Sequence, residues 1–317
     1  MKNYRIWLCA LGSVLMVSSL TQCTSDVPLP AGSVKLVDAQ ALQLMKEAQT
    51  AVDANRVDRA IKRYKKVVKD HALSVNAPEA RFRLGQLYER KDDPIEAFDQ
   101  YQYLIDNHPD SPLYKAALSR QKEIAFGAAE GKIKNKVLWL FDVSADPSHV
   151  TKWLKAIAQN APYSDMAPQA LFVLGEYSLK RNRMEEAMSA FQSLVDDYKQ
   201  SKLMPIAQMR VADIYRGQAA GGDKTLLNVN RARETYEDLL QLYPGGANST
   251  AAKKNLEEIQ RYLVEQKLHV ADYYQYKMKD RDAAIFCYGE VIRMGKDNPA
   301  AATKARQELK KMGVSAK

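Results

Sequence analysis

Glycine and proline are scarce in this chain of 317 residues: 14 glycines and 12 prolines make up about 8% of it, against a usual share of about 12%. This shortage excludes collagen-like, proline-rich and flexible-linker classes. Because 46% of the residues are hydrophobic, the composition is that of a folded protein and not of a disordered one. The length suits two domains or one elongated array. With a charged fraction of 27%, the shortage of turn residues favours helices over a turn-rich β fold.

Long runs of one charge are also missing. The chain has 47 lysines and arginines against 38 acidic residues, a formal net charge of +9, and the two signs are interspersed. Nucleic-acid binding needs a concentrated basic stripe, and no run of five like charges occurs. We therefore expect a mixed-charge, solvated surface and no nucleic-acid partner.

Residues that carry chemistry are few and scattered. The four histidines lie far apart in the sequence, and neither an H-E-x-x-H nor a G-x-S-x-G motif occurs. Gly217 and Gly222 have the separation of a phosphate loop, but Asp223 comes between the second glycine and Lys224, and no strand precedes them. We expect neither an enzyme nor a cofactor or metal site.

The N-terminus has the layout of an export signal. A basic stretch, residues 1–5, is followed by a mostly apolar, uncharged stretch, residues 6–20, which is short for a membrane-spanning helix. Leu20-Thr21-Gln22-Cys23 comes next. It resembles a bacterial lipobox, although Gln22 stands where a small residue is usual. The resemblance implies that residues 1–22 are a signal peptide and that Cys23 is lipidated, with palmitate-type chains. The alternative is an uncleaved N-terminal anchor.

The segment after that cysteine is a tether by composition. Residues 23–37 contain Pro28, Pro30 and Gly32, and the segment would let a folded body stand off a membrane surface. Of the three cysteines, Cys9 would leave with the signal and Cys23 would be acylated, so Cys287 would stand alone. No disulfide is then available, and a helical body of residues 38–317 needs none.

Two stretches of that body repeat each other. Each has a phenylalanine, a Leu-Gly pair, an alanine 12 residues after the glycine, and an aromatic residue four further on: Phe82, Leu84, Gly85, Ala97 and Tyr101 in the first, and Phe172, Leu174, Gly175, Ala187 and Phe191 in the second. These spacings resemble the tetratricopeptide repeat, a pair of antiparallel helices of about 34 residues. The glycine and the alanine would let the two helices cross closely, and the aromatic would fill the space between adjacent repeats.

Weaker copies extend the pattern over the rest of the body. Ala60, Ala232 and Ala284 each precede a tyrosine by four residues, and a degenerate copy has Val150 and Leu154. The sequence predicts an all-α tetratricopeptide superhelix of about five to six helix pairs, because one repeat cannot bury its own apolar face. Further expectations are an insertion at 131–148, a long loop at 217–230, helices at 249–267 and 270–276, and a terminal helix at 299–312.

The first helix of each repeat usually lines the binding face of such an array. An aromatic floor with charged walls suits an extended peptide or a partner helix. In the two clear repeats the candidate partner-binding residues are Phe82, Gln86, Glu89, Arg90, Phe172, Glu176, Leu179 and Lys180. The alternative is that the two phenylalanines only pack against neighbouring repeats.

A lipoprotein signal, a short tether and a tetratricopeptide array together resemble the BamD family of outer-membrane assembly lipoproteins. Three local stretches add to the resemblance: residues 103–112, residues 141–149 with their Asp and Pro residues, and the Val-Ala-Asp-Tyr-Tyr run at 270–274. The resemblance implies a lipid-anchored scaffold on the periplasmic face of the outer membrane. Its partners would be the barrel subunit of the β-barrel assembly machine and unfolded outer-membrane proteins.

Other periplasmic tetratricopeptide adaptors would show the same repeats. A secretin pilot lipoprotein would bind one secretin, and a cell-division coordinator of the Tol–Pal type would bind envelope enzymes. The sequence leaves these alternatives open.

Overall fold

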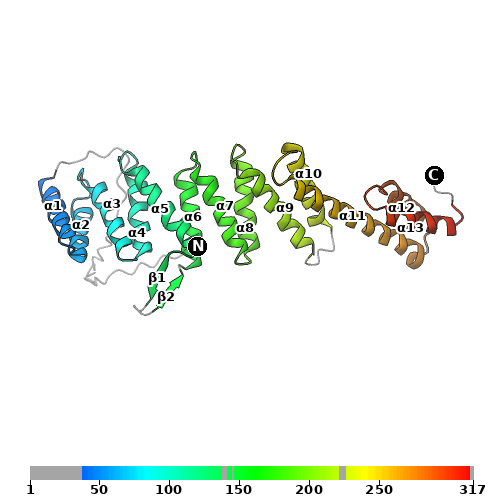
Figure 1. The fold of residues 1–317 in the computed structure, drawn as a ribbon, viewed down its shortest axis with the longest axis horizontal. Helices are drawn as coiled ribbons and strands as arrows, with labels where there is room; N and C mark the ends of the chain where they lie inside the picture. Colours follow the sequence, from blue (N-terminus) through cyan, green and yellow to red (C-terminus); the bar gives the residue numbers. More distant parts are fainter. Residues whose placement is uncertain (1–37, 138–140, 145, 221–225, 315–317) are drawn as a thin grey trace, which may run out of the picture.

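The structure, a computed structural model, describes residues 38–137, 141–144, 146–220 and 226–314. Signal, lipidation and tether, predicted at residues 1–37, lie outside these residues. The described part is an elongated row of antiparallel helices that stand side by side along one axis (Figure 1). No described helix is both long and apolar enough to span a bilayer.

Thirteen α-helices, one π-helical turn and two short strands make up the described residues. They are α1 (Ala39–Asp53), α2 (Val57–Asp70), α3 (Ala77–Arg90), α4 (Pro94–Asn107), α5 (Tyr114–Ala129), β1 (Lys134–Val137), β2 (Phe141–Ser144), α6 (Pro147–Asn160), α7 (Met166–Leu179), α8 (Met184–Asp197), α9 (Met204–Ala220), α10 (Leu227–Leu242), α11 (Ser249–Tyr273), η1 (Tyr274–Met278), α12 (Arg281–Arg293) and α13 (Pro299–Lys311).

Each helix packs mainly on its neighbours in sequence, so α1 to α12 form six pairs and α13 covers the end of the row. This confirms the predicted all-α solenoid of about six pairs. Four hydrophobic clusters follow one another from α1 to α13, and successive clusters share a helix. Contacts are thus local along the axis, as in other repeat proteins.

Small residues let the two helices of a pair cross closely. One alanine in the second helix of five pairs is fully buried, and the side chain four residues later is a buried aromatic: Ala60 and Tyr64, Ala97 and Tyr101, Ala187 and Phe191, Ala232 and Tyr236, Ala284 and Tyr288. In α6, Val150 and Leu154 take these two positions and are also fully buried. The degenerate repeat therefore keeps the packing of the others with aliphatic side chains.

The glycines of the two clear repeats make room for these aromatic rings. A Cβ atom on Gly85 would lie 2.5 Å from the ring of Tyr101, and one on Gly175 would overlap the ring of Phe191. Real Cβ atoms do not approach other heavy atoms this closely. Each ring thus sits against the glycine of its own pair, whereas the sequence analysis placed it between adjacent repeats.

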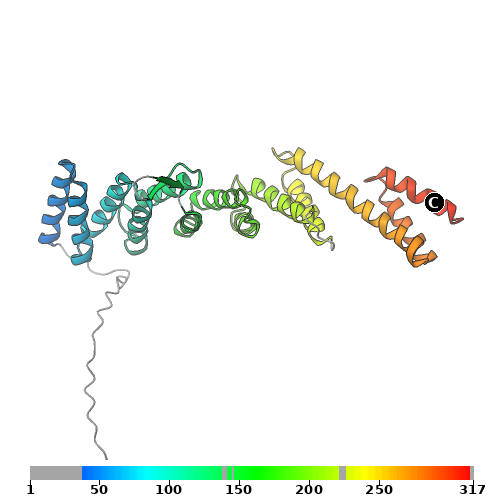
Figure 2. The same ribbon diagram turned by 90° about the horizontal axis from the view of Figure 1, so that it is seen from below.

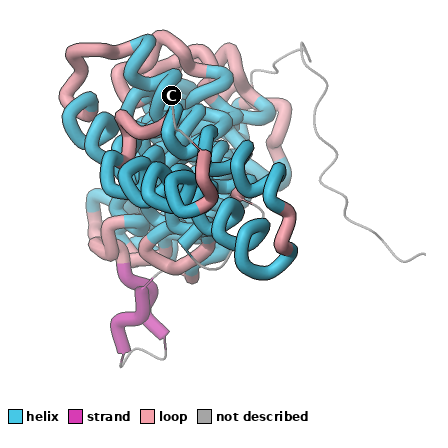
Figure 3. The backbone as a smooth tube through the Cα atoms, turned by 90° about the vertical axis from the view of Figure 1, so that its right-hand side faces the viewer, coloured by secondary structure: helices cyan, strands magenta, loops and turns pink. Residues whose placement is uncertain are grey.

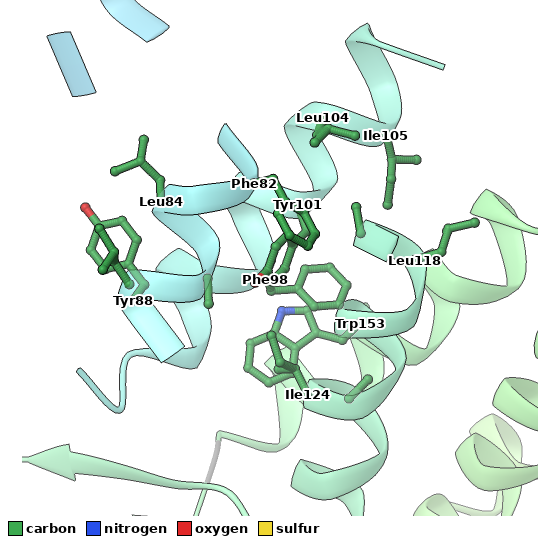
Figure 4. Packing of buried hydrophobic residues seen from close by; sticks show 14 of the residues in the cluster. Phe82, Leu84, Tyr88, Phe98, Tyr101, Leu104, Ile105, Leu118, Ile124 and Trp153 are labelled. Carbon is green, nitrogen blue, oxygen red and sulfur yellow. The ribbon is translucent and has the colours of Figure 1, made fainter. Parts of the chain in front are cut away.

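The largest cluster joins α1 to α8. Figure 4 shows its centre, where Phe98 of α4 stacks on Trp153 of α6 with ring centroids 5.2 Å apart. Trp153 is 1% exposed. An aromatic pair of this kind contributes about 0.5–1.5 kcal/mol beyond the area that it buries. It links the second pair of the row, α3–α4, to the degenerate pair α5–α6.

The tight turns within four pairs use one backbone conformation. Asn55, Asp92, Asn182 and Lys279 each follow the first helix of a pair with φ between 54° and 56°. Asn and Asp tolerate this left-handed conformation better than other non-glycine residues, because their short side chains bond locally to the backbone. These residues supply at the turns what glycine supplies in other proteins.

A hairpin interrupts the third pair. β1 and β2 pair antiparallel, with Lys134 opposite Ser144 and Val137 opposite Phe141, and the hairpin projects from the row of helices (Figure 3). It occupies the insertion predicted at residues 131–148, although the sequence analysis expected no strand there. Helix α6 then begins at Pro147, one residue before the predicted end of the insertion.

Two predictions about the C-terminal half were wrong. Most of the loop expected at residues 217–230 is helical, because α9 continues to Ala220 and α10 begins at Leu227. The helices expected at 249–267 and 270–276 are one helix, α11, followed by the π-helical turn η1. Figure 2 shows α11 as a single long rod that runs between the α9–α10 pair and the α12–α13 pair.

Candidate functional site

A groove lies across the first helices of the three N-terminal pairs. Its volume is about 610 Å³, and its lining comes from α1, α2, α3 and α5. The lining residues are Gln49, Val52, Tyr64, Arg83, Gln86, Leu87, Glu89, Arg90 and Arg120. Three of the predicted partner-binding residues, Gln86, Glu89 and Arg90, therefore lie together on one surface.

One carboxylate organises the inner wall of this groove. Glu89 of α3 accepts a hydrogen bond of 2.5 Å from the Tyr101 hydroxyl and one of 3.0 Å from Nε of Arg120. The same guanidinium also forms an ion pair with Glu89 and donates to Glu123. Because Tyr101 is on α4 and Arg120 is on α5, this carboxylate joins the second pair of helices to the third.

The two partners of Glu89 are held in their protonated forms. Burial, and then the hydrogen bond to Glu89, raises the pKa of Tyr101 above its ordinary value of about 10. The Glu89 carboxylate raises the pKa of the Arg120 guanidinium. Tyr101 therefore stays a hydrogen-bond donor and Arg120 stays a cation over the physiological pH range, so the wall of the groove has a fixed charge pattern.

The rim of the groove is cationic and open to solvent. Arg83 and Arg90 are both exposed on α3. Arg83 donates to Gln86 at 3.2 Å, and Arg90 donates to Asn55 at 3.1 Å. Both side chains keep donors for a ligand, since a guanidinium has five N–H groups. Arg83 also pairs with Glu79 of α3 at 3.5 Å. Among the residues that line the groove, three arginines against one glutamate favour a ligand that carries carboxylates, which arginine binds through two parallel hydrogen bonds.

Phe82 lies apart from these residues. It lines a separate pocket of about 380 Å³, together with Pro78 and Pro112. Its ring packs on Tyr101 at a centroid distance of 5.5 Å, and it is 8% exposed. The packing alternative that the sequence analysis left open describes this position; a role in partner binding stays a prediction.

Three of the four candidate residues in and after α7 contact neighbouring helices, and the fourth is exposed to solvent. Phe172 meets Phe191 edge to face at 5.7 Å, and Leu179 packs in the same cluster. Glu176 accepts a hydrogen bond of 2.6 Å from Nε of Arg210 on α9. Lys180 is exposed at the end of the helix. The structure does not join this set to the groove over α1, α3 and α5, and its binding role stays a prediction.

The sequence analysis missed the arginine that completes the groove. Arg120 sits on the first helix of the degenerate repeat, which no motif marks. A usable signal existed: Glu89 and Arg120 are separated by 31 positions, and Glu176 and Arg210 by 34, so each acid bonds to an arginine about one repeat later. Charges that recur at the repeat period would have identified the pairs.

The family comparison supports the repeats directly. The family model for the tetratricopeptide repeat matches residues 45–112 and 151–202. The first match covers most of α1 to α4, and the second runs from α6 to the end of α8, which are the regions of the two clear repeats. No curated relative matches the sequence.

Several solved tetratricopeptide structures are similar to this chain. The C-terminal part of a repeat-containing protein from Cytophaga hutchinsonii is 16% identical, with 84% of this chain and 87% of that chain covered and a TM-score of 0.33. PilF of Pseudomonas aeruginosa is 13% identical over 84% and 97%, with a TM-score of 0.30. A thermophilic protein of Thermus thermophilus is 12% identical over 68% and 98%, again with a TM-score of 0.30.

These similarities are too low to carry an argument about function. The assignment rests on the matched repeats and on the paired helices: the chain is an all-α tetratricopeptide solenoid. Solenoids of stacked helix pairs present extended surfaces on which other proteins bind. A protein-interaction scaffold is therefore the class that the fold and the groove define.

Proposed function

We propose that this chain is a lipid-anchored periplasmic scaffold of the outer-membrane β-barrel assembly machine, similar in role to the BamD family, and that it has no enzymatic activity. The groove over α1, α3 and α5 receives extended segments of unfolded barrel proteins. The barrel subunit of the machine is the second partner, and Cys23 carries the acyl chains that hold the scaffold at the outer membrane.

The groove is the observation that carries this proposal. It combines an apolar floor, Val52, Tyr64 and Leu87, with the exposed arginines of its rim. An extended polypeptide has apolar side chains, backbone carbonyls and carboxylates, and the groove offers a complement to each. Glu89, fixed between Tyr101 and Arg120, adds an acceptor for a backbone amide.

The sequence supports the finer assignment. The export signal and Cys23 favour a lipoprotein, and the Val-Ala-Asp-Tyr-Tyr run at 270–274 resembles the family's last repeat. In the structure Asp272 of this run accepts a 2.7 Å hydrogen bond from Tyr288 and pairs with Lys304. The run therefore has a packing role in the terminal helices, and the partner assignment depends on the groove and the lipobox.

The test is a crosslinked pull-down from detergent-solubilised envelopes of the native organism, with wild type beside Cys23→Ala and Arg83→Glu/Arg90→Glu. Both arginines are exposed, so the double change leaves the core intact. Lys253→Glu/Lys254→Glu, an exposed pair on α11, is the matched control for charge.

We expect wild type to recover a barrel subunit with repeated periplasmic domains, and Cys23→Ala to recover less of it. The arginine variant should lose crosslinks to barrel precursors while the lysine control keeps them. Recovery of a secretin, or of a Tol–Pal component, in place of the barrel subunit would contradict the proposal and move the function to the matching alternative. Equal precursor crosslinking in both charge variants would contradict the role of the groove.

A further inference from the structure

A second groove, larger than the one over α1, α3 and α5, lies toward the other end of the row. It has a volume of about 1120 Å³ and runs between the α9–α10 pair and the end of α12. Helix α11 forms its floor, α9 and α10 form one wall, and Met294, which follows α12, closes the far end. Its lining side chains are mostly apolar, whereas those of the groove over α1, α3 and α5 are mostly polar.

The length of α11 creates this groove. With 25 residues, α11 is about 37 Å long, whereas the other first helices of pairs have 14 to 17 residues. Its first half packs into the cluster of α9 and α10 through Ala252 and Ile259. Its second half packs into the cluster of α12 and α13 through Val264 and Leu268. The two pairs are therefore spread along one rod, and a stretch of its surface between them stays uncovered.

The uncovered stretch of α11 has the spacing of a helix-packing surface. Ile259, Tyr262, Leu263, Gln266 and Val270 line the groove at positions i, i+3, i+4, i+7 and i+11. Tyr262 is 41% exposed and Val270 is 48% exposed, which are high values for side chains of this size in a core-facing stripe. A helical ligand would pack on such a stripe through its own side chains at i, i+3, i+4 and i+7, which lie on one face. In an extended strand every second side chain lies on one face, so the spacing matches less well.

The rim of this groove is cationic. Arg216, Arg233 and Lys267 line it, against one acid, Glu258. The three cations pair with carboxylates at 3.3 to 3.9 Å, and their side chains are 35% to 47% exposed. The five carboxylates are those of Asp213, Glu234, Glu237, Glu258 and Glu290, of which Glu258 alone is among the lining residues. Exposed ion pairs contribute little to stability, so acids of a ligand can replace them. Nε of Arg233 is buried and has no hydrogen-bond acceptor among the described residues.

We propose that this surface, which consists of the α11 stripe with its walls on α9 and α10, is the docking site for an acidic amphipathic helix of a partner protein. The apolar face of the helix packs on Tyr262, Leu263 and Val270. Its flanking carboxylates pair with Arg216, Arg233 and Lys267. The partner's chemistry is set by the apolar stripe and by the three cations among the residues that line the groove. This site is separate from the groove over α1, α3 and α5 and does not depend on the proposed role in barrel assembly.

A second copy of this chain is the alternative occupant. In a symmetric dimer the same patch would lie on both subunits, and the test distinguishes this case from a partner helix.

The test uses the full-length chain in detergent and a synthetic helical peptide as the probe. The peptide has about 18 residues, or roughly five turns, with leucine at every third or fourth position and glutamate on both flanks. A second peptide has lysine in place of every glutamate. Binding is measured by fluorescence anisotropy for wild type, Tyr262→Glu and Arg233→Glu. Leu42→Glu on α1 is the matched control, because Leu42 is 46% exposed and lies at the opposite end of the row.

We expect saturable binding of the acidic peptide with a Kd below about 100 µM. Tyr262→Glu and Arg233→Glu should each weaken it about tenfold or more, as for other residues at the centre of an interface. Leu42→Glu should bind like wild type, and Arg233→Glu should gain affinity for the lysine peptide. Circular dichroism of each variant checks that its helix content is unchanged.

Three results would overturn the proposal. The first is a lack of saturable binding by the acidic peptide, and the second is equal affinity for the two peptides. The third is a dimer of the wild type in light scattering that Tyr262→Glu abolishes, which would make a second copy the occupant. Each is independent of the envelope pull-down, so failure here leaves the assembly role to stand on its own test.

Discussion

The close contact between Gly85 and the ring of Tyr101 makes a quantitative prediction. In Gly85→Ala the new methyl would lie 2.5 Å from two ring atoms of Tyr101, about 1 Å inside an ordinary carbon–carbon contact. The ring cannot retreat easily, because it is fully buried and its hydroxyl is bonded to Glu89. Overpacking of this kind costs about 1–3 kcal/mol, and the better helix propensity of alanine returns about 1 kcal/mol. We expect a net loss of up to about 2 kcal/mol in the free energy of unfolding.

Gly289→Ala is the matched control. Gly289 lies within α12, and no atom stands within 4 Å of the position that its Cβ would take. Because no clash occurs, the higher helix propensity of alanine is the main effect, so this variant should gain about 0.5–1 kcal/mol in the free energy of unfolding. The same chemical change should therefore have opposite signs at the two glycines, which removes any general effect of alanine from the comparison.

Urea unfolding followed by circular dichroism measures both variants. Hydrogen exchange in α3 and α4 is measured beside it, because repeat arrays can open locally. The double variant Gly85→Ala/Tyr101→Leu completes a cycle: with the smaller side chain, Gly85→Ala should become neutral or stabilising, which corresponds to a coupling energy of about 1–3 kcal/mol. A stabilising Gly85→Ala in the wild-type background, or a coupling energy near zero, would refute the close-contact argument.

Two further predictions concern pH and helix capping. Burial, and then a hydrogen bond to a carboxylate, raises the pKa values of Tyr101, Tyr236 and Tyr288 above the ordinary value of about 10. The unfolded chain then releases these protons at lower pH than the folded chain, so the stabilisation is fully present below about pH 10 and falls as the pH rises above it. In an alkaline titration, phenolate absorbance and circular dichroism should therefore change together. Ionisation of all three tyrosines at full helix content would contradict this. Asp280 accepts a 3.0 Å hydrogen bond from the amide of Ala283 at the start of α12. In urea unfolding, Asp280→Ala should therefore lose about 1 kcal/mol of stability, and Asp280→Asn should keep most of it. Equal losses in the two variants would exclude capping as the cause.

The sequence predicted the repeats well because their packing leaves a local signature. Gly85, Ala97 and Tyr101 meet in space, and their spacing is fixed by helix geometry and one tight turn, so the same spacing at Gly175 identifies the same contact. Features without such a signature were missed. Nothing between Lys267 and Val270 breaks a helix, so α11 continues through the boundary that was expected between them. No atom lies within 4 Å of the position that a Cβ on Gly217 would take. This glycine costs the helix only about 1 kcal/mol in propensity, so α9 continues past it.

The binding surfaces were harder to predict than the fold because they depend on neighbouring repeats. Gln86, Glu89 and Arg90 could be found on one helix by counting turns. Their partner Arg120 comes from a helix whose register is set by the stacking angle of the next pair, which local spacing does not encode. The groove along α11 depends on where two pairs contact one long helix, and this is again a tertiary property.

One polar contact recurs along the array, at the buried tyrosine ring in the second helix of a pair. The hydroxyls of three ring residues donate to an acid on the first helix of their own pair, and the acid also bonds to a side chain on a later helix: Tyr101, Glu89 and Arg120; Tyr236, Asp213 and Asn255; Tyr288, Asp272 and Lys304. In the α7–α8 pair the ring belongs to Phe191, which has no hydroxyl, and Glu176 bonds directly to Arg210 of α9. Each of these three hydroxyls thus has an acceptor and each of the three acids has a second donor, which ties neighbouring helices together. Glu89 belongs to such a contact and to the groove over α1, α3 and α5, so its replacement changes stability and binding together. The exposed Arg83 and Arg90 are better suited to report on binding alone.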